Sequence, residues 1–452
     1  MPPAQSPIQS PTHPPTRPIM IQNAQVLLPS GAVVPREVTA ANGRITAIGT
    51  QLEVPENTQV IDGAGLTLLP GVIDPHVHFR DPGLEHKEDL FTASRACVRG
   101  GVTSFLEMPN TLPLTTTQAV LTDKLAIAAT KCLVNYGFFI GATPANLNDL
   151  RTAHPTCGIK LSMYATDGLP SVNTDETIEP IFAAGRRLIS VHAENQARIT
   201  ERREQFAGET HPATHTKVQD NETAIIATTR ALGFSKKYQR RLHILHMSTG
   251  DEAELLRQDK PSWVTAEVTP QHLLLDISAY EALGTLVQTN PPLKYPRDRE
   301  MLWQALRDGI IDFIATDHAP HTLEEKAKGY PNAPSGMPGV ETALPLMLTQ
   351  AQENRCTVAQ VSNWMSTAVA HAYSIPNKGL IEPGFDADLV LVDLSTYRPV
   401  LREELQTKCS WSPFEGWNLT GWPVVTIVGG QVVYDRGQIN TSVRGRALQF
   451  TP

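Results

Sequence analysis

Two histidines with the spacing of metal ligands end a short apolar segment early in the chain. The segment GVIDPHVHFR (71–80) places His76 and His78 two residues apart. Side chains alternate along a strand, so both imidazoles would share one face and could chelate one metal ion. Two satisfied histidines on a half-buried strand would show the same spacing. Further ligands are needed to decide between these interpretations.

Four more residues with ligand chemistry lie at or near the ends of other apolar segments. They are Lys160 in GIKLSMY, His192 in ISVHAEN, His246 in HILHMSTG and Asp317 in FIATDHAPH. A charged lysine is a poor ligand, but carbamylation by carbon dioxide would turn Lys160 into a carboxylate-like bridge between two divalent ions. An unmodified lysine at this place could instead pair with a substrate anion. Spacing alone leaves both roles open.

Arg80 follows His78 by two residues and falls on the same face of the expected strand. A guanidinium there can bind a carboxylate through two parallel hydrogen bonds, whereas an isolated arginine would be a solvated surface charge. His243 precedes His246 by three residues, so it faces the other side of its strand and is expected to be a buried structural histidine. Glu194 and Glu267 also follow strands, where they could orient ligands, form salt bridges or cap helices.

Eight short apolar segments alternate with segments of helical periodicity and carry most of these residues at their ends. They span residues 71–79, 103–108, 134–140, 158–164, 188–193, 241–246, 263–268 and 312–317. Eight strand-then-helix units indicate an α/β fold, a (β/α)8 barrel of the TIM type. Functional groups of that fold lie at the C-terminal ends of the strands, so the sequence predicts that these residues meet at one mouth.

The two ends of the chain have a different pattern from the barrel. Short β-type runs with Gly, Asn and Pro turns fill residues 19–70 and 376–452, which predicts one small discontinuous β-sandwich made from both ends. Residues 71–375 would form the catalytic barrel. The proline-rich residues 1–18 cannot form helix or sheet ladders and are expected to be a disordered arm.

Composition limits the partners that the protein can have. Of 452 residues, 46 are acidic and 38 basic, so the formal net charge is −8, which argues against a nucleic-acid binder and favours a small-molecule substrate. The 5 cysteines are scattered without a CxxC pair, which favours a reducing compartment. The sequence shows no signal peptide and no apolar run long enough for a membrane, so we expect a cytoplasmic protein.

A long segment brings these observations together. HVHFRDPGLEHKEDLFTASRACVRGGVTSFLEMPNT (76–111) resembles the dihydroorotase signature of the amidohydrolase superfamily. HAEN, HILHMST, TAEVTPQHL, NPPLK, ATDHAPHTLEEK, PSGMPGVET and KGLIEPGFDADLVLVD resemble the same family, in its order. The resemblance extends over nearly the whole chain from residue 19 onward.

The resemblance implies a site with two zinc ions. His76, His78 and Asp317 would bind one ion, His192 and His246 the other, and Lys160 as N6-carboxylysine would bridge them together with a hydroxide. Asp317 would also transfer the catalytic proton. Arg80, Asn110, Asn290 and His321 would bind the substrate, with backbone contacts from Pro338 and Gly339.

The implied reaction is the reversible cyclisation of N-carbamoyl-L-aspartate to L-dihydroorotate with loss of water, the third step of de novo pyrimidine synthesis. A homo-oligomer, with a dimer favoured, and an association with aspartate transcarbamoylase are expected. Hydantoinases, dihydropyrimidinases and allantoinases share the barrel and metals, but Arg80 and Asn110 argue against them because their substrates lack the ring carboxylate. A non-catalytic scaffold is disfavoured because every ligand position is filled.

Overall fold

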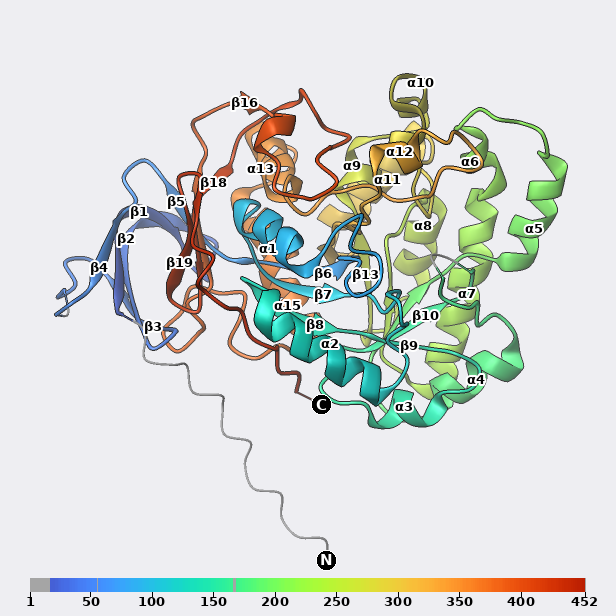
Figure 1. Cartoon of the computed structure of the whole chain (residues 1–452), viewed down its shortest axis with the longest axis horizontal. Coiled ribbons are helices and arrows are strands. Elements are labelled where there is room, and N and C mark those ends of the chain that lie inside the picture. Colours follow the sequence, from blue (N-terminus) through green and yellow to red (C-terminus); the bar gives the residue numbers. More distant parts are fainter. Residues whose placement is uncertain (1–16, 55, 166–167, 452) are drawn as a thin grey trace, which may run out of the picture.

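A closed barrel of parallel strands forms the centre of the molecule (Figure 1). The computed structural model describes residues 17–54, 56–165 and 168–451, so the expected arm of residues 1–18 lies almost wholly outside the described residues. The barrel strands are β6 (Val72–Val77), β7 (Val102–Glu107), β8 (Asn135–Phe138), β9 (Ile140–Gly141), β10 (Ile159–Ser162), β11 (Ile189–His192), β12 (Leu242–Ile244), β13 (Val264–Val268) and β14 (Phe313–Ile314).

Two contacts close the barrel. Strands β6 to β8 form one parallel sheet and β9 to β14 another, and the chain passes directly from β8 to β9 at Phe139. On the other side, Val77 pairs in parallel with His318, and the amide of His78 donates a hydrogen bond of 2.8 Å to the carbonyl of His318. The eight expected strands are therefore present, and the third changes pairing partner half-way along its length.

Helices cover the outside of the barrel (Figure 1). They are α1 (Leu90–Arg99), α2 (Gln118–Lys131), α3 (Leu147–Thr152), α4 (Asp175–Ala183), α5 (Gln196–Gln205), α6 (Thr214–Val218), α7 (Asn221–Tyr238), α8 (Gly250–Asp259), α9 (Pro270–Leu274), α10 (Ala279–Leu283), α11 (Pro296–Arg307), α12 (Leu323–Lys326), α13 (Ala343–Gln352), α14 (Val358–Ser362) and α15 (Ala368–Ala372), with short turns η1 (Gly284–Val287), η2 (Asn363–Thr367) and η3 (Arg402–Glu404). Capping residues fix where several of these helices begin. Thr249, five residues after the end of β12, forms a capping box with Glu252 that starts α8.

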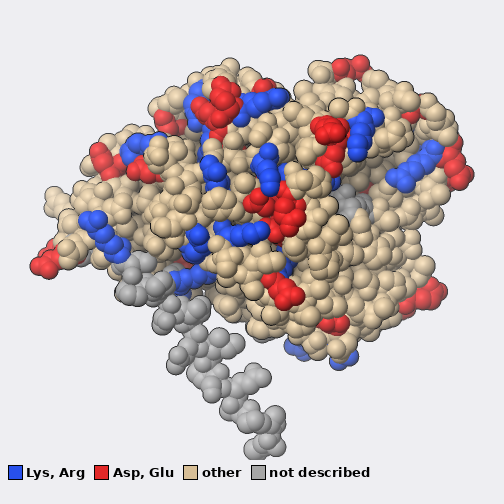
Figure 2. All heavy atoms as spheres, viewed as in Figure 1, with Lys and Arg blue, Asp and Glu red and all other residues tan. Residues whose placement is uncertain are grey.

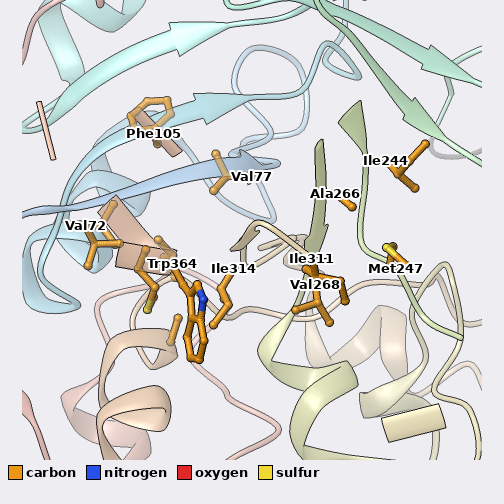
Figure 3. Packing of buried hydrophobic residues seen from close by; sticks show 14 of the residues in the cluster. Val72, Val77, Phe105, Ile244, Met247, Ala266, Val268, Ile311, Ile314 and Trp364 are labelled. Atoms are coloured by element: carbon orange, nitrogen blue, oxygen red, sulfur yellow. The ribbon is translucent and has the colours of Figure 1, made fainter. Parts of the chain in front are cut away.

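Apolar side chains fill the layer between the barrel and its helices. Figure 3 shows part of this cluster, with Val77, Phe105, Val268 and Ile314 from the strands and Trp364 of η2, which lies beside Ile314. Each of these side chains is at most 5% exposed. Burial of one such side chain contributes about 1.5–3 kcal/mol relative to an exposed one. This layer holds the strands in register and so fixes the positions of the residues at their ends.

Strands from the two ends of the chain form one nine-stranded sheet beside the barrel (Figure 1). The N-terminal strands are β1 (Ile19–Leu27), β2 (Val33–Ala41), β3 (Arg44–Gly49), β4 (Gln59–Asp62) and β5 (Thr67–Pro70); the C-terminal ones are β15 (Leu389–Asp393), β18 (Trp422–Val428), β19 (Gln431–Asp435) and β20 (Gln438–Ile439). Antiparallel pairing of β5 with β15 joins the two sets. This confirms a discontinuous β-unit built from both termini, while the domain limits at residues 18, 70 and 375 stay predictions. The short strands β16 (Arg398–Pro399) and β17 (Asn418–Leu419) pair separately.

Charged side chains of both signs are intermixed on the face shown in Figure 2. The described part of this face therefore has no continuous basic surface of the kind that follows a nucleic-acid backbone. Within the described residues, we find no helix that combines the length and the apolar character needed to cross a membrane.

Candidate metal centre

The predicted ligands lie at the C-terminal ends of the barrel strands. His76 lies in β6, and His78 is the first residue after that strand. Lys160 lies in β10, and His192 is the last residue of β11. His246 and Asp317 come two and three residues after β12 and β14. The histidines and Lys160 are buried, at 0–8% exposure, and the Asp317 side chain is 12% exposed. The fold thus brings all six residues to one mouth.

Polar atoms of these residues converge on one another. Asp317 Oδ1 lies 3.0 Å from His78 Nε2 and 3.2 Å from His76 Nε2. Ligand atoms of His76, His246 and Asp317 all lie within 4.8 Å of one another. His192 Nδ1 lies 2.9 Å from His246 Nε2. The structure therefore has one continuous cluster, in which His246 belongs to both expected ligand groups.

Burial gives the cluster the electrostatics of a cation site. It lowers the pKa of His76 and places the pKa of His246 well below its usual value, and the nearby charge of Lys160 lowers both further. The imidazoles of His76 and His246 are therefore neutral, each with a lone pair on one ring nitrogen. His246 Nδ1 is buried without a hydrogen-bond partner among the described residues, and His76 Nε2 is buried with only the Asp317 carboxylate beside it, which is costly unless a ligand satisfies them. These donors fit a divalent metal ion.

Glu267 at the end of β13 fixes the orientation of His76. Its Oε1 lies 2.5 Å from His76 Nδ1 and accepts a hydrogen bond from the His246 amide, while Oε2 lies 2.9 Å from His243 Nε2. Burial alone would raise the pKa of Glu267, but its close interactions with His76 and His243, including a hydrogen bond with each, outweigh burial and lower the pKa to about 2. The carboxylate therefore holds the proton on His76 Nδ1 and leaves Nε2 for a metal.

Two further oxygens orient ligand histidines. Asn110 Oδ1 lies 2.7 Å from His78 Nδ1, and Glu194 Oε2 lies 2.8 Å from His192 Nε2. The sequence suggested only a substrate contact for Asn110 and left Glu194 open among several roles. Glu194 contacts His192 because residues two apart along a strand lie on the same face. The contact of Asn110 with His78 instead joins residues that follow two different strands.

Arg80 and His321 lie side by side at the rim of the cluster. Arg80 Nη2 lies 3.1 Å from His321 Nε2, and Arg80 Nε donates to the carbonyl of Pro320. Lys87 Nζ lies 3.0 Å from His321 Nδ1 and 3.2 Å from Glu325. Two cations, an imidazole and the carboxylate of Glu325 therefore stand together here. Lys87 was not singled out in the sequence, although it lies inside the signature segment.

Strained backbone gathers at this mouth. Arg80, His246 and Asp317 have φ angles of 66°, 35° and 48°, the left-handed region that residues other than glycine seldom adopt. Each stands directly after a barrel strand or within three residues of its end. Such strain costs of order 1–3 kcal/mol per residue and persists only where the surrounding structure enforces it.

The remaining predicted contacts are placed differently. Asn290 Oδ1 lies 2.9 Å from Nε2 of the buried His215, a histidine with no signal in the sequence. The amide of Gly339 donates to His318 Nδ1 at 3.0 Å. Among the described residues, Asn290 forms no hydrogen bond with the metal-ligand histidines, so its expected substrate contact stays a prediction.

Comparisons with known proteins agree with this geometry. The model of the Amidohydrolase family matches residues 67–433. The dihydroorotase of Methanosarcina acetivorans is 34% identical over 447 residues, which cover 95% of each chain. The dihydroorotase of Bacillus subtilis is 33% identical over 93% of this chain and 99% of its own length.

Solved structures of related enzymes have the same fold. The L-hydantoinase (dihydropyrimidinase) of Arthrobacter aurescens superposes with a TM-score of 0.90 at 30% identity, over 95% of this chain and 99% of that one. The dihydropyrimidinase of Brevibacillus agri gives 0.89 at 27% identity, over 96% and 99%. Barrel, cluster and sequence agree, and the chain belongs to the dihydroorotase family within the amidohydrolases.

Proposed function

We propose that the protein is a zinc-dependent dihydroorotase, a cyclic amide hydrolase that interconverts N-carbamoyl-L-aspartate and L-dihydroorotate. The observation that carries this proposal is the pair of Arg80 and His321 beside the histidine cluster, 3.1 Å apart. Dihydroorotate differs from dihydrouracil and hydantoin by its ring carboxylate, and a guanidinium is suited to hold that group. The similarity to curated dihydroorotases supports the same assignment.

The proposed metal centre holds two zinc ions. His76, His78 and Asp317 would bind one, His192 and His246 the other, and a carboxylated Lys160 would bridge them. The buried imidazoles and their outer partners Glu267, Asn110 and Glu194 support these assignments. When bound, the ions would supply a Lewis acid for the amide carbonyl and lower the pKa of a water molecule.

The chain's own groups would position the substrate and move the proton. Arg80 and His321 bind the ring carboxylate and set the amide bond against the cluster, with the side-chain amide of Asn110 nearby. In the hydrolytic direction Asp317 accepts a proton from the attacking water and delivers it to the departing ring nitrogen. In the cyclising direction Asp317 takes the proton from the ureido nitrogen. Its position, within 3.2 Å of two ligand histidines, supports this role.

A turnover comparison of dihydroorotate, dihydrouracil, hydantoin and allantoin, with metal content measured on the same sample, tests the proposal. We expect turnover of dihydroorotate alone, in a protein that contains zinc. Preferred turnover of hydantoin or dihydrouracil would move the chain to the activity named for its structural neighbours. Metal-free, inactive protein prepared without chelators would support a scaffold instead.

The oligomeric state and a complex with aspartate transcarbamoylase also remain proposals. Tyr397 and Trp417, 64% and 38% exposed, lie next to the paired strands β16 and β17, and Leu401 is exposed close by. Such apolar side chains suit contact with a second protein chain. Sedimentation of the protein alone and with aspartate transcarbamoylase would report both associations.

Replacing Arg80 by lysine is expected to raise the KM for dihydroorotate by roughly 10- to 100-fold while zinc content stays the same. Lysine keeps the charge but loses the planar fork, and one charge-assisted hydrogen bond contributes about 1.5–3 kcal/mol. Steady-state kinetics and metal analysis measure the two effects. Arg297→Lys is the control, because that side chain is 73% exposed. Unchanged kinetics in the Arg80 variant would remove it from the site.

Replacing Glu267 by glutamine is expected to weaken zinc binding by roughly 10- to 100-fold, the usual effect of losing a group that orients a ligand. A glutamine has one acceptor oxygen, so it cannot accept from both His76 and His243. Zinc retained after dialysis against a weak chelator is the measurement. Glu254→Gln, on the exposed side of α8, is the control. Equal retention by both variants would contradict the orienting role.

A further inference from the structure

A basic pocket lies at the end of the barrel opposite the metal centre. It is a surface pocket of about 480 Å³. The segments that lead into β10, β11 and β12 form much of its wall, with Arg187 two residues before β11 and Arg241 directly before β12. Helices α3 and α4 lie beside these segments, along the lower edge of the barrel in Figure 1. The pocket is therefore separate from the catalytic mouth.

Positive charge dominates the pocket. Of the residues with a described position, five arginines line it, namely Arg151, Arg186, Arg187, Arg240 and Arg241, and no aspartate or glutamate does. Among the residues that the structure describes, none of the five forms an ion pair with a carboxylate. Like charges gathered without counter-charges repel one another. A bound anion would remove this repulsion.

The three inner arginines have only partial compensation. Each donates to a backbone carbonyl at the C-terminal end of a helix: Arg187 at α3 over 2.6 Å, Arg240 at α4 over 2.6 Å and Arg241 at α15 over 2.6 Å. A helix end offers about half a negative charge. A net positive charge therefore remains at the pocket.

Arg240 has hydrogen-bonding capacity that the protein does not use. It is 2% exposed, and its Nε is buried without a hydrogen-bond partner in the described part of the chain. Burial together with the charge of Arg187 lowers the pKa of Arg240 to about 10, so it stays cationic. A buried, unsatisfied N–H is costly, so the protein leaves the charge of this guanidinium incompletely stabilised beside the pocket.

Apolar side chains complete the walls. Leu150, Leu188, Tyr373 and Phe450 line the same pocket, next to the arginines. Guanidinium groups bind phosphate through paired hydrogen bonds, and pockets of about 300–1,000 Å³ hold small metabolites. We propose that this pocket binds a small phosphate ester, with the phosphate on the arginines and a flat, apolar body against Leu188, Tyr373 and Phe450.

A role limited to capping helix ends would account for the three inner arginines but not for the pocket as a whole. Arg151 and Arg186 are exposed at its rim, and neither side chain makes a hydrogen bond or ion pair with another described residue. Their charge adds to the repulsion without stabilising a contact. They are therefore the positions where binding can be tested without disturbing the fold.

Calorimetry and thermal melting of the full-length protein with phenyl phosphate and inorganic phosphate test the proposal. We expect both to bind and raise the Tm, with phenyl phosphate binding more tightly, because a ligand of the folded state stabilises it. In an Arg151→Gln, Arg186→Gln double variant, binding should weaken by at least about 10-fold, the effect of roughly 1.4 kcal/mol. Turnover measured without phosphate should stay unchanged.

A control variant removes the same charge elsewhere. Arg36 and Arg297 lie on exposed surface away from the pocket, and Arg36→Gln, Arg297→Gln should bind phenyl phosphate like the parent protein. Absence of saturable binding, or equal weakening in both double variants, would overturn the proposal. Equal affinity for phenyl and inorganic phosphate would overturn the apolar part of it. Binding is measured without turnover, so this result is independent of the proposed activity.

Discussion

Replacing Lys160 by alanine is expected to lower the zinc content well below two ions per chain and to abolish turnover. Two cations about 3.5–4 Å apart repel each other, and a carboxylated lysine would supply the shared anion that offsets this repulsion. Lys160 is 4% exposed and its charge acts on both His76 and His246, so it lies near one member of each proposed ligand group. Metal analysis and a turnover assay on the same sample measure the effect.

A short-chain carboxylic acid should restore part of the lost activity, because it replaces the bridging oxygens. Lys87→Ala is the matched control: it removes a lysine that contacts His321, so KM should rise while both zinc ions remain and added acid has no effect. A Lys160→Ala variant that behaves in this way, with both ions retained and only KM changed, would contradict the bridging role. It would favour a cationic lysine that pairs with the substrate.

Replacing Asp317 by asparagine is expected to lower kcat by roughly 10²- to 10⁴-fold, the usual contribution of a general acid–base. Asparagine keeps the shape and one oxygen near His76 and His78 but cannot carry the proton between water and the ring nitrogen. Affinity for the carboxylate should change little, because Arg80 and His321 are unaltered. Kinetics at saturating zinc separate this loss from weaker metal binding.

Asp312→Asn is the control for this prediction. Asp312 stands at the other end of the last barrel segment, where it pairs with Lys260 at 2.6 Å. Its loss should affect stability and leave kcat near that of the parent protein. If Asp317→Asn recovered full kcat once zinc was saturating, Asp317 would be a ligand only and another group would transfer the proton.

The sequence predicted the positions of the barrel strands and of the residues at their ends because both depend on local patterns. Strand periodicity places His76 and His78 on one face, and the barrel fold places strand ends together. Local periodicity did not predict that Asn110 is the hydrogen-bond partner of His78. Asn110 reaches it because β6 and β7 pair with Val77 opposite Glu107, and that register results from packing across the barrel.

Contacts between distant segments were the least predictable part of the site. Lys87 and His321 are 234 residues apart, and they meet only because the barrel closes between Val77 and His318. Asn290 likewise meets a distant residue, because its hydrogen-bond partner His215 is 75 residues away in the sequence. No local periodicity carries such information, so these pairs required the structure.

Pairing of β5 with β15 has a consequence for the order in which the protein is made. Thr67 and Leu68 emerge from the ribosome long before Leu391 and Val392, their partners in the sheet. At about 5–20 residues per second, some 320 intervening residues take roughly 15 to 60 s to synthesise. During that time the edge of β5 has no native partner, and an open strand edge invites pairing with other chains. The nascent chain therefore needs protection at this edge until its last strands arrive.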